Sequence, residues 1–324
     1  MARYLLRRLL LSLLLVVVVS SSALVLTRLA PGDITSEQVG SGASSRDLDL
    51  ERERLGLRRP FAVQYLEWAG RAVRLDLGTS LMYGRPVSEL VIERARNTAL
   101  LAVVALGLAT LVGLPLGVIA GSRQGMTAAL IRGGSLLALS LPSLVSSLML
   151  VFLAARTGWF PTGGMTSPEP AAGGWLAGAL DVARHLVVPG LAIALPLAAT
   201  LERMQARAVS EILREPFVAA AAARGVPAAR VLWRSVLKPA LRPVAAIYGL
   251  VFGSLLSGSF VVEIVTSWPG LGKLMYDALR SRDLYLVAGC AAAGGVFLAV
   301  GALLSDVALA MVDPRLRGRI GGDA

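Results

Sequence analysis

Six long runs with almost no charge divide this chain, and they decide what it can fold into. The runs are Leu9–Leu29, Ala99–Gly121, Gly133–Ala155, Leu186–Leu201, Val244–Val262 and Leu284–Val312. A helix needs about 20 predominantly apolar residues to cross a bilayer. A chain that is 55% hydrophobic and only 16% charged is also too apolar for a soluble domain. We therefore predict an all-α polytopic membrane protein with six transmembrane helices.

The first run also allows a second interpretation, a cleaved secretory signal peptide. Arg3, Arg7 and Arg8 precede it, and small residues follow at Ser20–Ala23. The apolar stretch nevertheless continues to Leu29, which is long enough to span a membrane. We expect a first transmembrane helix, with the signal peptide as the alternative.

The distribution of charge predicts the orientation of the chain. If the N-terminus lies in the cytoplasm, the segments on that side together carry the whole net charge of +11, and the outer segments are neutral. Short loops rich in Arg and Lys stay on the cytoplasmic side of a membrane. Both termini are therefore expected in the cytoplasm, and the basic balance reflects topology rather than nucleic-acid binding.

Four regions follow from this topology. Residues 1–30 form an N-terminal tail and the first helix, residues 31–97 an extracytoplasmic cap, residues 98–312 the remaining helices, and residues 313–324 a cytoplasmic tail. Within the cap, apolar spacing predicts short helices over Asp47–Leu55 and Phe61–Val73. We expect the cap to be a lid on the membrane surface, and a direct role in substrate binding is the alternative.

Small and polar residues within the runs suggest how the helices pack. Gly113, Gly117 and Gly121 recur at steps of four, which predicts the close approach of another helix backbone. Proline at 142 can kink the third run. Ser254 and Ser257 give the fifth run a small polar face, which indicates either helix packing or a solute path.

Asp306 lies in the last run. A carboxylate is costly in lipid, so we expect it to face other helices or water, as part of the path or as a local pairing group.

The stretch Glu202–Arg242 carries eleven charged side chains between two apolar runs. At about 2.5 kcal/mol for each charge at mid-bilayer, burying them all in lipid would cost roughly 27 kcal/mol. This segment, which we delimit as residues 203–242, therefore lies in water between two spans. An ordered aqueous segment in that position is expected to be a docking surface.

Its residues predict two short helices joined by a tight bend. Pro216 suits a first helical turn and alanines follow it. Gly225 can adopt the left-handed conformation that ends a helix, and Pro227 can open the next one. We call residues 216–231 the elbow.

In the second helix, Ala229, Trp233 and Leu237 are predicted to form a buried apolar stripe, with Arg230, Arg234 and Lys238 on another face. On physical grounds alone, two other structures remain open. One is an amphipathic hairpin lying on the anionic inner leaflet. The other is a DNA-reading helix-turn-helix, although an alanine-rich helix offers few side chains that read bases.

The elbow resembles the cytoplasmic loop of ABC transporter permeases, in which a helix, a glycine and a second helix dock on an ATPase subunit. Further stretches resemble the B-type permease subunit of dipeptide, oligopeptide and nickel importers, a binding-protein-dependent type I importer family, and they cover nearly the whole chain in order. They are RLAPGD (28–33), LGLRRPFAVQYLEW (55–68), DLGTS (76–80), FVVEIVTSWPGLGKLMYDALRSRDL (260–284) and LSDVALAMVDPRLR (304–317). Leu75 stands where this family usually has glycine, and Thr266 where it usually has phenylalanine.

The resemblance implies a permease subunit of an ATP-driven importer, most simply of di- or oligopeptides, with nickel or another solute as the alternative. The implied partners are a second permease subunit, two ATPase subunits, an extracytoplasmic solute-binding protein and membrane lipid. The implied location is the inner membrane of a bacterial or archaeal cell. The residues implied to couple to the ATPase are Phe217, Val218, Ala221, Arg224, Gly225, Val226 and Arg230.

Candidates for the translocation path or its gate are Ser254, Ser257, Glu263, Trp268, Gly270 and Asp306. The chain lacks the phosphate-binding pattern GxxxxGK[ST], so ATP and Mg²⁺ are expected on the partner ATPases and no cofactor on this chain.

Two rival functions remain. An ion-coupled secondary carrier would use an ionisable site within the membrane and often two related halves. An intramembrane enzyme would need a nucleophile with a base, or a metal. The chain has one histidine, His185, and one cysteine, Cys290, which provide neither a metal cluster nor a disulfide. We therefore expect a transport subunit that is not an enzyme.

Overall fold

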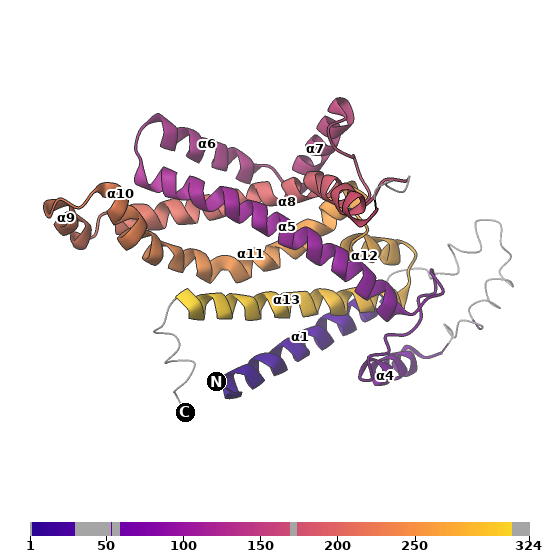
Figure 1. Cartoon of the computed structure of the whole chain (residues 1–324). Helices are drawn as coiled ribbons and strands as arrows, with labels where there is room; N and C mark the ends of the chain where they lie inside the picture. The colour runs from indigo at the N-terminus through magenta and orange to yellow at the C-terminus, as the bar shows by residue number, and fades with distance from the viewer. Residues whose placement is uncertain (1, 30–52, 54–58, 169–173, 313–324) are drawn as a thin grey trace. The chain divides into compact units, whose positions relative to one another are not determined.

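The computed structural model describes residues 2–29, 53, 59–168 and 174–312, and most of these residues lie in helices (Figure 1). The helices are α1 (Ala2–Leu29), α4 (Phe61–Ala72), α5 (Val87–Ser122), α6 (Met126–Ser140), α7 (Ser143–Thr157), α8 (Gly174–Ile212), α9 (Pro216–Ala223), α10 (Ala228–Val231), the π-helical turn η1 (Leu232–Val236), α11 (Leu237–Val265), α12 (Leu271–Arg280) and α13 (Leu284–Val312).

Several of these helices can cross a membrane. Among the described residues, four are long and apolar enough: Arg8–Leu29 of α1, all of α5, all of α8 and Leu284–Leu304 of α13. The pair α6 and α7 adds a fifth if the two halves form one broken span. This confirms a polytopic, all-helical membrane protein, whereas the number of six spans and the direction of the termini stay predictions.

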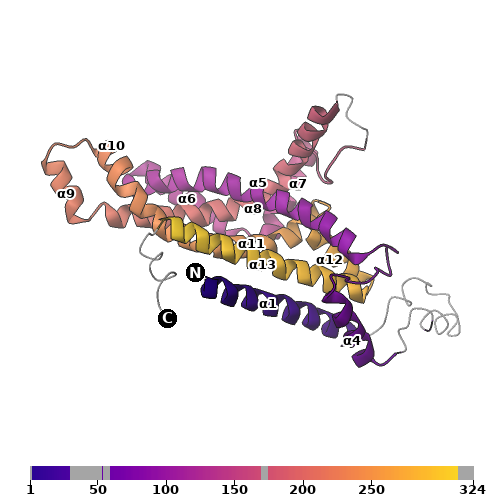
Figure 2. The same ribbon diagram turned by 60° about the horizontal axis from the view of Figure 1, so that its bottom comes forward.

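The single helix predicted over Gly133–Ala155 is wrong. The run is divided between α6 and α7, which are bent by 102° at the residues between them. Pro142 restricts the residue before it to extended conformations, and Leu141 has φ −88° and ψ 115°. The helix therefore ends at Ser140 and restarts in a new direction, as Figure 2 shows.

The glycine spacing in the second run correctly predicts a close helix contact, between α5 and α8. A Cβ atom at Gly113, Gly117 or Gly121 would lie 2.5, 2.6 and 2.5 Å from a backbone carbonyl oxygen of α8, those of Ala198, Glu202 and Ala206. Only hydrogen fits at such a distance. We call this contact the α5–α8 seam.

The chain forms two compact units. The first is built around Ala99–Trp268 and has its apolar core between α5, α8 and α11, with Leu101, Leu201 and Leu255 fully buried. The second is built around Arg7–Thr98 and Pro269–Val296.

In the second unit, α4 confirms the helix predicted over Phe61–Val73 and packs through Trp68 on Leu24 and Ala288. The Tyr65 hydroxyl also lies 2.8 Å from that of Ser21, in α1. The other predicted cap helix, Asp47–Leu55, lies outside the described residues except for Glu53, as do the predicted tail 313–324 and most of RLAPGD. Helix α5 starts at Val87, ten residues before the predicted end of the cap.

Two of the stretches that carry the family resemblance meet in this unit. Asp283 is fully buried and accepts hydrogen bonds from the Ser80 hydroxyl (2.7 Å), the Met82 amide (3.0 Å) and the Leu286 amide (3.1 Å). The bond from Leu286 satisfies a backbone amide in the first turn of α13, where the helix itself offers no carbonyl acceptor. Asp283 thus ties the DLGTS turn to the first turn of α13.

Candidate functional site

The elbow lies at one end of α8 and α11, at the opposite end of these helices from α7 (Figures 1 and 2). Helix α9 begins at Pro216 after an extended Glu215. Gly225 follows the helix with φ +76°, as its predicted left-handed conformation requires. The bend predicted at Gly225 is therefore confirmed.

Hydrogen bonds close this bend in a recurrent pattern. The Gly225 amide donates to the Ala222 carbonyl at 2.9 Å, and the Val226 amide donates to the Ala221 carbonyl at 3.2 Å. This pair of bonds, with a left-handed glycine between them, is the Schellman helix ending. Val226 also packs in the cluster that contains Ala221, the apolar contact that usually accompanies this ending.

The second arm of the elbow differs from the prediction, because it is not a separate short helix. It runs as α10, η1 and α11 without a break, and at η1 the Leu237 amide bonds to the Leu232 carbonyl, five residues earlier. Pro239 has no amide hydrogen for the Ser235 carbonyl, so a regular α-helical pattern cannot continue there.

The predicted buried stripe is wrong. Trp233 is 66% exposed and Ala229 is exposed, whereas Val231, Val236 and Ala240 are the buried residues of this arm. Ala229 precedes the π-turn, and Trp233, four residues later, is exposed like it. The spacing therefore identified a shared face, but that face is not the buried one.

The residues predicted to couple to an ATPase divide into two sets. Phe217, Arg224, Gly225 and Arg230 are exposed. Val218, Ala221 and Val226 instead pack into an apolar cluster with residues of α8, α10, η1 and α11; its buried members are Ala208, Val209, Ala221, Val231, Val236 and Ala240. The first set offers a surface to a partner, and the second fixes α9 to the rest of the first unit.

The predicted path and gate residues are not gathered at the elbow. Glu263 and Trp268 lie fully buried near the other end of α11, about 40 Å along the helix from Leu237. Gly270 caps the start of α12. The side chains of Ser254, Ser257 and Asp306 lie outside the described residues, although their helices are described.

The turn around Thr266 is closely packed. The Gly164 amide donates to the Thr266 carbonyl at 2.9 Å, and a Cβ at Gly163 would lie 2.6 Å from the same oxygen. After the turn, the Asn97 side chain donates to the Pro269 carbonyl at 2.8 Å, and the Leu271 amide donates to the Thr98 hydroxyl at 2.7 Å. The backbone of residues 266–271 is thus held at several points.

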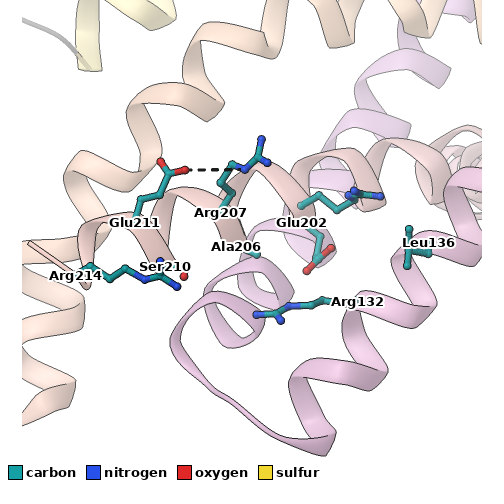
Figure 3. A pocket seen from close by; sticks show the side chains of 9 residues that line it. Arg132, Leu136, Glu202, Ala206, Arg207, Ser210, Glu211 and Arg214 are labelled. Atoms are coloured by element: carbon teal, nitrogen blue, oxygen red, sulfur yellow. Dashed lines mark ion pairs between the residues drawn. The ribbon is translucent and has the colours of Figure 1, made fainter.

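The sequence did not predict a pocket that the structure shows between α6 and the C-terminal third of α8. Its volume is about 410 Å³. The lining residues are Arg132, Leu136, Glu202, Arg203, Ala206, Arg207, Ser210, Glu211 and Arg214 (Figure 3). The available signal was the charged residues directly outside two apolar runs, Arg132 before Gly133 and Glu202 after Leu201.

Nothing in the described part of the chain suggests a resident metal. No group of three or more His, Cys, Asp or Glu residues there could hold a metal ion. Cys290 is buried and reduced.

Comparison with known proteins identifies two family models along the chain. Residues 113–318 match the binding-protein-dependent transport system inner membrane component, and residues 1–102 match the model of the N-terminal part of the membrane component of such systems. The chain is also 34% identical over 324 residues to the oligopeptide transport system permease protein AppB of Bacillus subtilis, covering 98% of this chain and 99% of that protein.

Two further relatives are similar over nearly the whole chain. A putative peptide permease protein of Brucella suis is 32% identical, with 98% of this chain and 99% of that protein covered. A probable peptide ABC transporter permease protein of Sinorhizobium fredii is 31% identical, with 98% and 100% covered.

Proposed function

Because the chain belongs to the family of inner-membrane components of binding-protein-dependent transport systems, we propose that it is the permease subunit of an ATP-driven importer of di- or oligopeptides. Membership of this family makes the chain a multi-pass membrane transport subunit and not an enzyme. Membership of this family also favours a binding-protein-dependent transporter over the alternative function, an ion-coupled secondary carrier. The peptide substrate rests on relatives of matching length that are named as peptide or oligopeptide permeases.

The proposed complex contains this chain, a second permease subunit, two ATPase subunits and an extracytoplasmic solute-binding protein. Six spans with both termini in the cytoplasm place the elbow on the side where ATP is available. The positive charge of the segments on that side supports this orientation. ATP and Mg²⁺ would bind to the ATPase subunits, and the two permease subunits together would enclose the peptide path.

The observation that carries the mechanism is the contrast between the two faces of the elbow. Phe217, Arg224 and Arg230 are exposed, while Ala221 and Val226 pack in a cluster that joins α9 to α8 and α11. A displacement of α9 by an ATPase would therefore move the ends of two long membrane helices at once. Such a movement can switch the path between two packings, provided that the ATPase grips the elbow differently in each state.

Replacement of Gly225 by valine tests this mechanism in the assembled complex. No atom lies within 4 Å of a Cβ built at Gly225, so in the chain alone the substitution costs only the left-handed conformation at φ +76°, about 1–2 kcal/mol. In a complex where an ATPase covers the elbow, the isopropyl group would occupy the contact. We expect Gly225→Val to insert into the membrane normally and to lose solute-stimulated ATP hydrolysis.

Gly158→Val is the matched control. Gly158 also has a left-handed φ, +67°, and also has no atom within 4 Å of a built Cβ, but it ends α7. If both variants lose activity equally, backbone strain explains the loss and the coupling role is excluded. If Gly225→Val retains full stimulation, the elbow does not couple this chain to an ATPase.

A further inference from the structure

The pocket between α6 and α8 combines charges of both signs in an unusual way. Four arginines line it with two glutamates and Ser210. Most of these charged groups reach water, but Glu202 is only 1% exposed. Neither of its carboxylate oxygens has a hydrogen-bond partner among the described residues. A buried carboxylate without a donor is costly, so the pocket is incomplete as it stands.

The arginines nearby do not satisfy Glu202. The Arg132 guanidinium faces the same opening from α6 (Figure 3), but its Nη2 donates to the Ala120 carbonyl at 2.8 Å. Arg207 lies 4.0 Å from Glu211, on the exposed side of α8. The pocket therefore offers guanidinium groups for an anion and, deeper, a carboxylate that needs a hydrogen-bond donor.

The position of the pocket along the helices places it at the edge of the membrane. Glu202 directly follows the apolar run that ends at Leu201, and Arg132 directly precedes the run that begins at Gly133. Charged lining residues thus begin where lipid-compatible sequence stops, at the depth of the lipid headgroups. Helix α6 exposes Leu130, Leu136 and Leu137 over 55% or more of their surfaces, and Leu136 among them lines the pocket. Exposed leucines are typical of a helix that faces acyl chains.

We propose that this pocket binds the headgroup of an aminophospholipid, a phosphodiester that carries a primary ammonium, such as phosphatidylethanolamine. The phosphate is received by guanidinium groups of the lining, Arg214 among them, and the ammonium donates to the carboxylate of Glu202. The acyl chains lie along the exposed leucines of α6. A headgroup with both charges matches the whole lining best, because a purely anionic lipid brings no cation to the carboxylate of Glu202.

This site does not depend on the proposed peptide substrate or on the coupling role of the elbow. It depends on the membrane location of the chain, which its family establishes. In the proposed orientation, with both termini in the cytoplasm, the pocket lies at the inner leaflet.

Lipid binding to the purified full-length complex tests the proposal, by native mass spectrometry with three lipids of equal chain length. Phosphatidylethanolamine is the probe, phosphatidylcholine has the same net charge without N–H donors, and phosphatidylglycerol has the phosphate without the ammonium. We expect phosphatidylethanolamine to bind about tenfold more tightly than either, since one hydrogen bond to a charged group distinguishes them. This comparison needs no variant. Equal binding of all three lipids would overturn the proposal.

Substitutions locate the site. Glu202→Gln removes the carboxylate with almost no change of shape, and we expect it to abolish the preference for phosphatidylethanolamine while phosphatidylglycerol still binds. Arg214→Gln is expected to weaken both lipids, and Arg242→Gln, an exposed arginine of α11 outside the pocket, is expected to weaken neither. A preference that survives in Glu202→Gln contradicts the proposed role of the carboxylate.

Two other occupants are separated by the same assay. If soluble glycerophosphoethanolamine binds as tightly as the lipid, the ligand is a free metabolite and the lipid proposal fails. If Arg214→Gln releases ATPase subunits and leaves lipid binding unchanged, the pocket is part of a protein interface and the proposal fails as well. Loss of lipid preference with intact solute-stimulated ATP hydrolysis supports the lipid site and leaves the proposed transport function standing.

Discussion

Glycine serves opposite purposes at the α5–α8 seam and at the elbow. At Gly117, a Cβ would lie 2.6 Å from the Glu202 carbonyl and 2.6 Å from the Gln205 Cβ, so the position requires space. At Gly225, no atom lies within 4 Å of a built Cβ, and the position requires a left-handed backbone instead. The seam is complete within this chain, whereas the space around Gly225 is open.

The largest expected effect is at the seam. Gly117→Val should push α5 away from α8, because the contact is with backbone and cannot be relieved by a side-chain rotation. We expect a loss of about 3 kcal/mol in the free energy of unfolding, at the upper end of the usual cost of overpacking. The measurement is unfolding of the purified protein in mixed detergent micelles, followed by circular dichroism.

Gly107→Val is the control on the same helix. No atom lies within 4 Å of a Cβ built at Gly107, so its substitution should leave stability nearly unchanged. Equal losses at both positions would mean that valine itself, and not the seam, destabilises α5.

A second pair of substitutions separates the two faces of α9. Ala221 is buried in the cluster with α8 and η1, and Ala222 is exposed. Ala221→Leu should destabilise the protein by about 2 kcal/mol because it overpacks that cluster. Ala222→Leu should leave stability unchanged and reduce the affinity for ATPase subunits. If the two variants behave alike in both assays, α9 does not have one face for its own chain and another for a partner.

These comparisons also show which features the sequence could predict. The spacing of Gly113, Gly117 and Gly121 reports a local helical periodicity, and Pro216 with Gly225 reports local backbone preferences, so both were predicted correctly. The ends of the last run were also predicted correctly, because α13 coincides with Leu284–Val312.

The failures have a different origin. Trp233 is exposed because the second arm packs on the cluster through Val231, Val236 and Ala240 instead, a choice of face that hydrophobic spacing alone does not reveal. The sequence around Pro142 is compatible both with a mild kink in one helix and with the 102° bend between two helices that the structure shows, so it could not distinguish them. The burial of Glu202 depends on where α6 lies against α8, a tertiary contact between residues about 70 positions apart in sequence.

A smaller effect is expected for an exposed aromatic of the elbow. Phe217 is 45% exposed at the start of α9. Phe217→Ala should leave stability unchanged and weaken the association of ATPase subunits about tenfold, as truncation of an interface anchor commonly does. Co-purification at graded ATPase concentrations measures this.

Phe152→Ala, an equal truncation of an exposed phenylalanine on α7, should leave the association unchanged. Unchanged association in both variants would show that no ATPase contacts Phe217.

The smallest expected effect comes from introducing a glycine where the backbone is already left-handed. Leu75 has φ +63°, a left-handed conformation that glycine adopts without strain, and the family resemblance leads one to expect glycine there. Leu75 is 84% exposed, so its side chain contributes little packing that could be lost. Leu75→Gly should therefore raise the free energy of unfolding by up to about 1 kcal/mol. Val73 lies two residues earlier and is 86% exposed, but it has φ −59°, so Val73→Gly should lower stability by about 0.5–1 kcal/mol. If the two substitutions change the free energy of unfolding in opposite directions, backbone conformation decides where this chain needs glycine outside its helix contacts. If both variants lose stability, that explanation is refuted, for Gly225 as well.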